Sequence, residues 1–104
     1  MTVNLIVRQE AEADIADACR WYEAQRPGLG HDFLDAVESA FERIAEQPLR
    51  YAPIHRDTRR TFLRRFPYVV FHVLRDESVH VIAVLHHRRS PRLLRRRTSR
   101  FEGG

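Results

Sequence analysis

Two runs dense in β-branched and aromatic residues, 64–74 and 79–89, constrain the fold of this chain more than any other feature. A polar segment of only four residues, 75–78, separates them, and this pattern predicts an antiparallel hairpin. Side chains alternate along a strand, so we expect one face of the hairpin to belong to the core. That face carries Val69, Phe71, Val73, Val79, Val81, Ala83 and Leu85. The other face is expected to be amphipathic and only partly covered, and it carries Val70, His72, Leu74, His80, Ile82 and Val84.

Two segments before the hairpin have apolar residues at helical spacing, 10–25 and about 31–46. Pro27, Gly28 and Gly30 lie between them, so the connection is short and predicts an antiparallel pair of helices. The first stripe contains Ala11, Ile15, Ala18, Cys19 and Tyr22, and the second contains Phe33, Leu34, Val37, Phe41, Ile44 and Ala45.

The remaining segments complete an α+β domain that we expect to span residues 1–104. Residues 2–9 and 58–66 alternate as strands do, and 49–57 is expected to be a loop. Beyond a break at Ser90 and Pro91, residues 92–97 are expected to form one basic helical turn and 98–104 a frayed tail. The predicted order is β-α-α-β-β-β, with the helical hairpin packed on a small, mainly antiparallel sheet.

Charge is distributed very unevenly along the 104 residues. Residues 1–49 contain four arginines and ten acidic residues, whereas 50–104 contain fourteen arginines and four acidic residues, so the net charge changes from −6 to +10. This asymmetry predicts a basic surface that meets nucleic acid or an acidic protein, although a solvated charged surface remains the alternative. The single cysteine, Cys19, fits a reducing compartment, and no apolar run reaches the roughly 18 residues of a membrane span, so we expect a cytoplasmic protein without membrane contact.

The histidines are the first candidates for chemistry. His72, His80, His86 and His87 lie in the hairpin, but no second cysteine and no carboxylate at ligand spacing complete a metal site, so we expect neither metal nor another cofactor. Cleavage of RNA through its own 2′-hydroxyl needs an acid, a base and cations, which histidine and arginine supply. The candidates are His55, His86, His87, Arg59, Arg60, Arg64, Arg65, Arg88 and Arg89. The same residue types also occur together on surfaces without a catalytic role.

Arginine runs near the predicted strand ends form a candidate binding patch. They comprise Arg56, Arg59 and Arg60, then Arg64 and Arg65, Arg88 and Arg89, and finally Arg95, Arg96 and Arg97. Tyr68, Phe66 and Phe71 are interleaved with them, as base stacking would require, although we expect both phenylalanines to be core residues. Trp21 is expected to be a packing residue on the first helix.

Several motifs in a fixed order resemble a known family. They are ADIADA at 13–18, WYE at 21–23, Phe33-Leu34 and Pro48 at the ends of the second helix, FPYVVF at 66–71 and VLHHRRSP at 84–91. In order and spacing the chain resembles the RelE/ParE superfamily of type II toxin–antitoxin toxins, and its ParE-like branch in particular. The resemblance implies a small toxin fold whose groove binds the acidic, partly disordered tail of a cognate antitoxin in a hetero-oligomer.

The resemblance also implies two alternative targets. ParE-like toxins poison DNA gyrase, whereas RelE-like toxins are ribosome-dependent endoribonucleases that cut mRNA. RelE-type nucleases carry a basic residue early in the strand that here reads Tyr68-Val69-Val70, and an acid–base residue where this chain has Leu93 or Leu94. Part of the nuclease set is therefore missing, and we favour a non-enzymatic gyrase poison; a third alternative is a non-toxic module that only binds antitoxin.

Candidate site residues follow from these alternatives. For contact with the target or nucleic acid we predict Arg59, Arg60, Arg64, Arg65, Tyr68, Arg88, Arg89, Arg95 and Arg96. If the chain is a nuclease, its catalytic residues are predicted to be His86, His87, Arg88 and Arg64.

Overall fold

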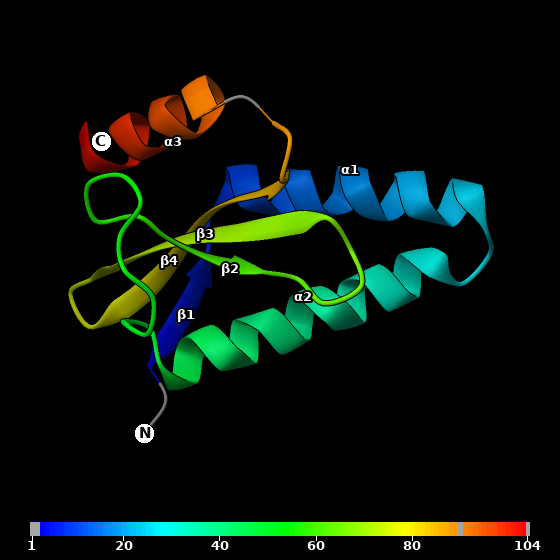
Figure 1. Ribbon diagram of the computed structural model, residues 1–104, viewed down its shortest axis with the longest axis horizontal. Helices are drawn as coiled ribbons and strands as arrows, with labels where there is room; N and C mark the ends of the chain where they lie inside the picture. Colours follow the sequence, from blue (N-terminus) through cyan, green and yellow to red (C-terminus); the bar gives the residue numbers. More distant parts are fainter. Residues whose placement is uncertain (1–2, 90, 104) are drawn as a thin grey trace.

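The computed structural model describes residues 3–89 and 91–103. Along the chain the elements are β1 (Asn4–Val7), α1 (Gln9–Gln25), α2 (Leu29–Glu46), β2 (Arg59–Phe62), β3 (Tyr68–Arg75), β4 (Ser78–His86) and α3 (Pro91–Gly103) (Figure 1). The predictions for Met1, Thr2, Ser90 and Gly104 lie outside the described residues. Within the described part of the chain, no helix is long and apolar enough to cross a membrane.

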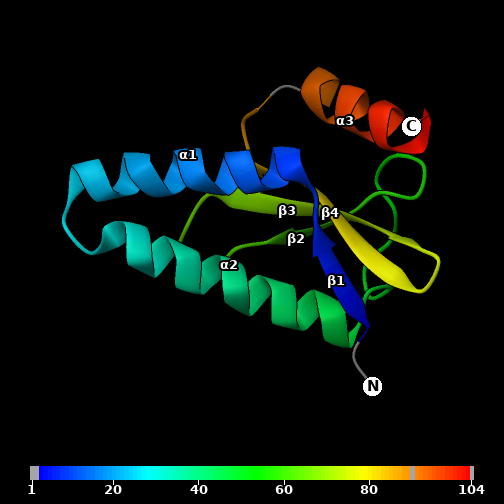
Figure 2. The ribbon, with the colours of Figure 1, turned by 180° about the vertical axis from the view of Figure 1, so that it is seen from behind.

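The four strands form one sheet in the order β1-β4-β3-β2. β1 runs parallel to β4, while β3 pairs antiparallel with both β4 and β2. Seen from behind, α1 and α2 cross one face of this sheet, and α3 lies on the other side (Figure 2). The predicted α+β class, the element order and the mainly antiparallel sheet are therefore confirmed.

The tight turn between α1 and α2 depends on two glycines. Gly28 has a φ of 90°, a left-handed conformation that glycine adopts without a steric cost. Gly30 is packed so closely that a Cβ atom there would lie 2.9 Å from the carbonyl oxygen of Cys19. The Glu23 carboxylate accepts hydrogen bonds from the backbone N–H groups of Gly28 at 3.1 Å and Gly30 at 3.0 Å, which fixes the turn.

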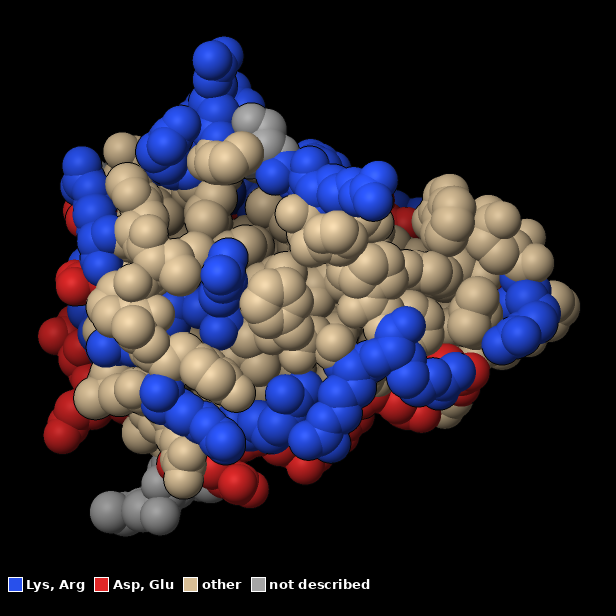
Figure 3. Space-filling model, in the orientation of Figure 1, with Lys and Arg blue, Asp and Glu red and all other residues tan. Residues whose placement is uncertain are grey.

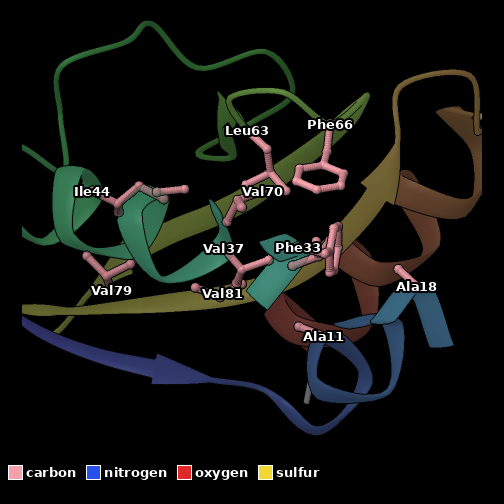
Figure 4. Packing of buried hydrophobic residues seen from close by; sticks show 12 residues of the cluster. Ala11, Ala18, Phe33, Val37, Ile44, Leu63, Phe66, Val70, Val79 and Val81 are labelled. Atoms are coloured by element: carbon pink, nitrogen blue, oxygen red, sulfur yellow. The ribbon is translucent and has the colours of Figure 1, made fainter. Parts of the chain in front are cut away.

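The main core lies between the helical hairpin and the sheet (Figure 4). From the helices, Phe33, Val37 and Ile44 are buried against Val70 and Val81 of the sheet. The ring of Phe33 stacks on Tyr22 with centroids 5.3 Å apart and meets Phe66 edge-on at 5.4 Å. Further buried members of this cluster are Ala11, Ala18, Ala40, Leu63, Val79 and Val84.

A β-bulge changes which side chains of the hairpin share a face. His72 pairs with Val81 but its neighbour Phe71 pairs with Ala83, so Ile82 is an extra residue in β4. Val79, Val81 and Val84 consequently belong to the core under α1 and α2, whereas Val73, Ile82, Ala83 and Leu85 form a second cluster with Leu94 of α3. The predicted grouping of Val79 and Val81 with Ala83 and Leu85 is therefore wrong. The prediction that the other face is amphipathic and only partly covered is also wrong, since Val70, His72 and Val84 from that predicted face are buried.

The C-terminal helix is longer than expected. α3 runs from Pro91 to Gly103, so the predicted single turn at 92–97 and the frayed tail from 98 are wrong over the described residues. Leu94 and Thr98 are buried on the inner side of α3, and the Thr98 hydroxyl lies 3.3 Å from that of Thr58. The predicted strand 58–66 is shorter, at Arg59–Phe62.

Candidate functional site

A hollow of about 370 Å³ opens on the face of the sheet that lies away from the helical hairpin, between β2 and α3. We call it the sheet groove. It is lined by Ile54, Arg60, Phe62, Val69, Phe71, Leu85, His86, His87, Arg89, Pro91 and Leu94. Figure 3 views the molecule from this side, where a mostly uncharged central surface, interrupted by arginine, is bordered by further arginines above and below.

Side chains alternate along β2, and this alternation turns the apolar ring of Phe62 into the groove. Thr61 is buried, whereas its neighbours Arg60 and Phe62 face out, and the side chain of Phe62 is 53% exposed. The guanidinium of Arg60 lies 5.3 Å from the centre of the Phe62 ring, a cation–π contact. Ile54 from the preceding loop is exposed beside them. The groove therefore offers apolar area next to positive charge.

The end of β4 supplies the rim. The His87 N–H donates to the Pro67 carbonyl at 2.9 Å, and the Arg89 N–H donates to the His86 carbonyl at 2.9 Å. The backbone N–H of Arg88 donates to Nδ1 of His86 at 3.1 Å. Burial first, and then the neighbouring His87 and Arg88, lower the pKa of His86 below its ordinary value. The neutral imidazole of His86 is thus favoured, and its Nδ1 accepts the hydrogen bond from Arg88.

A second hollow, of about 430 Å³, lies between α1 and the end of β4, and we call it the Trp21 hollow. Trp21, Asp17, Tyr68 and Arg89 line it together with Glu10, Ala13, Asp14, Ala18, Val84, Leu85 and Arg97. Trp21 is 58% exposed, so its predicted role as a packing residue is wrong; its ring meets that of Tyr22 in a T-shaped contact with centroids 5.1 Å apart.

A buried ion pair at this hollow fixes α3 to the rest of the molecule. Nη1 and Nη2 of Arg97 donate to the two carboxylate oxygens of Asp14 at 2.9 and 3.0 Å, and Nη1 also reaches the carbonyl of Ile82 at 3.1 Å. Asp14 accepts a further bond from the N–H of Val84 at 3.0 Å. The hydrogen bond to Asp14 raises the pKa of Arg97 above its ordinary value. Arg97, predicted to be part of the surface patch, is instead a structural residue.

The predicted target-binding residues are distributed over several places. Arg60 and Arg89 line the sheet groove, while Arg59 donates from Nε to the carbonyl of Tyr51 at 2.6 Å and holds the preceding loop. Nη2 of Arg65 lies 3.7 Å from Oδ2 of Asp32, in the first turn of α2. The others, Arg64, Arg88, Arg95 and Arg96, are exposed but do not line the groove within the described chain.

Tyr68 lies on the opposite face of the sheet from the groove. Its ring meets Phe33 at 5.2 Å and His86 at 5.5 Å, and burial is the main cause that raises its pKa. The histidines do not all converge: His86 and His87 stack with ring centroids 4.7 Å apart, but His72 and His80 lie elsewhere. His72 is buried and donates from Nε2 to the Pro48 carbonyl at 2.9 Å, whereas His80 packs on Phe101 of α3. No group of three or more metal-ligating side chains occurs among the described residues.

Sequence reasoning missed two features of these surfaces. Positions 10, 14, 17 and 21 recur at intervals of four, three and four, which places Glu10, Asp14, Asp17 and Trp21 on one stripe of α1. That stripe lies at the edge of the apolar one, and a helical projection would have found it. Phe62 in the groove floor alternates with buried Thr61, so strand periodicity would have marked it as outward-facing.

Comparison with known proteins gives a consistent result. The family model for the ParE toxin of type II toxin–antitoxin systems, parDE, matches residues 5–91. Proteins named Toxin ParE2 from two strains of Mycobacterium tuberculosis, CDC 1551 / Oshkosh and H37Rv, are 33% identical to the chain over 95 residues, and the match covers 88% of this chain and 88% of each relative. These matches confirm the resemblance inferred from the motifs.

A solved structure shares the fold. A chain from the structure titled Chromosomal ParDE TA system from P. aeruginosa aligns with a TM-score of 0.73 and 12% sequence identity. The alignment covers 82% of this chain and 96% of that one. At this identity the likeness concerns the fold alone.

Proposed function

The chain belongs to the ParE toxin family of type II toxin–antitoxin systems, and we propose that it inhibits growth by poisoning DNA gyrase and is neutralised by a cognate antitoxin. In this proposal the toxin is a non-enzymatic binding protein that stabilises the complex of gyrase with cleaved DNA. Free toxin and antitoxin-bound toxin would then be the active and inactive states.

The antitoxin is proposed to bind in the sheet groove. Phe62, Val69 and Phe71 offer an apolar floor, and Arg60 and Arg89 offer positive charge at its border. The segment that fits is an acidic chain with apolar side chains at intervals, which also suits the net charge of +10 in residues 50–104. Such a tail would fold on binding and give a toxin–antitoxin hetero-oligomer.

The observation that carries the choice of gyrase over mRNA is the dispersal of the nuclease candidates. Phosphodiester cleavage needs an acid, a base and cations aimed at one phosphate. His86 and His87 line the sheet groove, but Arg64 lies in the connection before β3, and neither Arg64 nor Arg88 lines the groove within the described residues. An apolar floor with separated cations supports binding of a protein chain better than catalysis on a phosphate.

Two assays on the purified toxin, run at matched concentrations, test the proposal. Inhibited supercoiling by gyrase, accumulated cleaved DNA and intact mRNA on programmed ribosomes are the expected results. Cut mRNA with unaffected gyrase would overturn the proposal and make His86 and His87 catalytic candidates again.

A double variant, Arg88→Ala with Arg89→Ala, tests the arginine assignment. We expect it to lose growth inhibition while it stays folded, because both side chains are exposed. Unchanged toxicity of this variant would remove these arginines from the site.

A further inference from the structure

We propose that the target protein docks on the Trp21 hollow, separately from the antitoxin in the sheet groove, and that Arg89 is shared by the two sites. This inference rests on the proposed function, since it names the surface through which the toxin would hold its target. The occupant is a protein surface that presents an apolar side chain to Trp21 and a carboxylate to Arg89.

Trp21 has the properties of an interaction anchor. Its side chain is 58% exposed, although large aromatic side chains gain most from burial. Tyr22 supports it edge-on, and Tyr22 is itself fixed between Phe33, Phe66 and Tyr68 at centroid distances of 4.9 to 6.0 Å. The Trp21 indole therefore contacts a packed cluster of aromatic rings, which limits the side-chain entropy that Trp21 would lose on binding.

The charges around Trp21 select the class of partner. Glu10 and Asp14 are engaged by Arg97 and Arg100, and Asp17 pairs with Arg20. Arg89 has no ion-pair partner among residues 3–89 and 91–103, and its positive charge acts on the Tyr68 hydroxyl to lower its pKa, against the dominant effect of burial. One available cation thus lines the same hollow as Trp21.

Acidic residues on the same stripe make nucleic acid a poor occupant. Glu10, Asp14 and Asp17 line the hollow together, and each is paired with an arginine, so among the described lining residues only Arg89 remains as a cation without an ion-pair partner. A phosphate backbone binds through a row of cations, whereas a protein that offers one carboxylate to Arg89 and apolar area to Trp21 needs only one. Arginine and tryptophan are both enriched among the residues that contribute most to protein interfaces.

The position of Arg89 connects this surface to neutralisation. Arg89 and Leu85 line both the sheet groove and the Trp21 hollow, which therefore meet at the end of β4. An acidic antitoxin tail in the groove that pairs with Arg89 removes this cation from the target surface. Neutralisation would then follow from competition for one side chain, while Trp21 stays uncovered.

Four single variants of the full chain test the proposal, each checked for folding by circular dichroism. Trp21→Ala should weaken inhibition of gyrase supercoiling roughly thirty-fold or more, with binding to the cognate antitoxin of the proposed function changed less than about threefold. Phe62→Ala should show the reverse pattern, and Arg89→Ala should weaken both. Leu49→Ala is the matched control, because Leu49 is also 58% exposed but lines neither hollow, and it should change neither.

The outcomes separate this inference from the proposed function. If the unmodified toxin does not inhibit gyrase, the proposed function fails first. If the unmodified toxin inhibits gyrase and Trp21→Ala inhibits equally well, the docking surface is wrong while gyrase poisoning stands. If Trp21→Ala loses binding to a short DNA duplex in proportion to its loss of gyrase inhibition, the partner is nucleic acid and the inference is overturned.

A fluorescence titration gives an independent measurement, because Trp21 is the only tryptophan of the chain. A tryptophan-free peptide of the antitoxin tail should saturate the toxin without a blue shift of the Trp21 emission. A large blue shift on binding would show that the antitoxin itself buries Trp21, which contradicts two separate sites.

Discussion

The two faces of the sheet are covered in different ways. Under α1 and α2, side chains such as Phe33, Val70 and Val81 are completely buried. On the other face, α3 covers Val73 and Ile82 but leaves the strip beside β2 open as the sheet groove. One face therefore contributes most of the apolar burial that stabilises the fold, and the other keeps apolar area available for a partner.

The contacts that attach the helices to the sheet also differ between the two faces. The helical hairpin is held by a continuous apolar and aromatic cluster. α3 instead depends on polar contacts as well, including the pair of Arg97 with Asp14 and that of Arg56 with Glu102 at 3.2 Å. We call the face of the sheet under α1 and α2 the closed face, and the face with α3 and the sheet groove the open face. Changes in the closed face should thus affect the whole fold, whereas changes on the open face should affect α3 or binding.

The largest effect is expected for Phe33→Ala in the closed face. Phe33 is completely buried and contacts Tyr22, Phe66 and Tyr68, so its truncation leaves a cavity among three rings. We expect the free energy of unfolding to fall by about 3–5 kcal/mol, measured by urea denaturation. A loss below about 1 kcal/mol would show that this face is not the main source of stability.

The second effect concerns the attachment of α3. Asp14→Ala removes the carboxylate that binds Arg97 through two hydrogen bonds, in a site where both side chains are only 12% exposed, and leaves the guanidinium only Glu10 at 3.6 Å and the Ile82 carbonyl at 3.1 Å. We expect a loss of about 3 kcal/mol, with the amide protons of α3 becoming the least protected of the three helices in hydrogen exchange. Asp17→Ala is the control, because its pair with Arg20 is exposed and should contribute less than about 1 kcal/mol. Equal losses in the two variants would contradict the structural role of Arg97.

The third effect is a pH dependence in the closed face. Burial lowers the pKa of His72 below its ordinary value, so the unfolded chain takes up a proton at a higher pH than the folded one. Stability from this group is fully present above about pH 7.5 and is lost as the pH falls through the ordinary histidine range near 6.5. We expect the free energy of unfolding to decrease from pH 8 to pH 5, and to decrease less in a His72→Gln variant. His80 and His86, whose pKa values are also lowered, should leave part of the slope in that variant. Parallel pH profiles for the two proteins would remove His72 as a source.

The sequence predicted those parts of the fold that depend on local periodicity. The helical stripes and the hairpin of Tyr68–Arg75 and Ser78–His86 follow from patterns of spacing 3.6 and 2 within single segments. The bulge at Ile82 was not predictable in this way. Residues 79–85 are apolar at nearly every position, so one inserted residue exchanges the faces without changing the pattern.

The candidate site was predicted in composition but not in arrangement. The arginine-rich second half indicated a basic surface, and Arg60 and Arg89 do line the sheet groove. Arg97 could not be distinguished from Arg95 and Arg96 in the sequence, because its partner Asp14 lies 83 residues away. The full length of α3 was hidden for a related reason: its few apolar residues, Leu93, Leu94 and Phe101, gain their burial only against the sheet.

The smallest effect on stability is expected for a second phenylalanine-to-alanine substitution, on the open face instead of the closed face. Phe62→Ala removes a ring that is 53% exposed and whose main neighbour is the guanidinium of Arg60, so no cavity forms. The free energy of unfolding should change by about 1 kcal/mol or less, against the several expected for Phe33→Ala. Urea denaturation of both variants under one condition measures the difference directly. If Phe62→Ala instead destabilises the chain as much as Phe33→Ala, the groove floor is part of the core, and a partner would have no preformed apolar surface to bind. If Phe62→Ala hardly changes the free energy of unfolding, the Phe62 ring does not stabilise the free toxin, and its apolar surface stays available for burial under a bound chain.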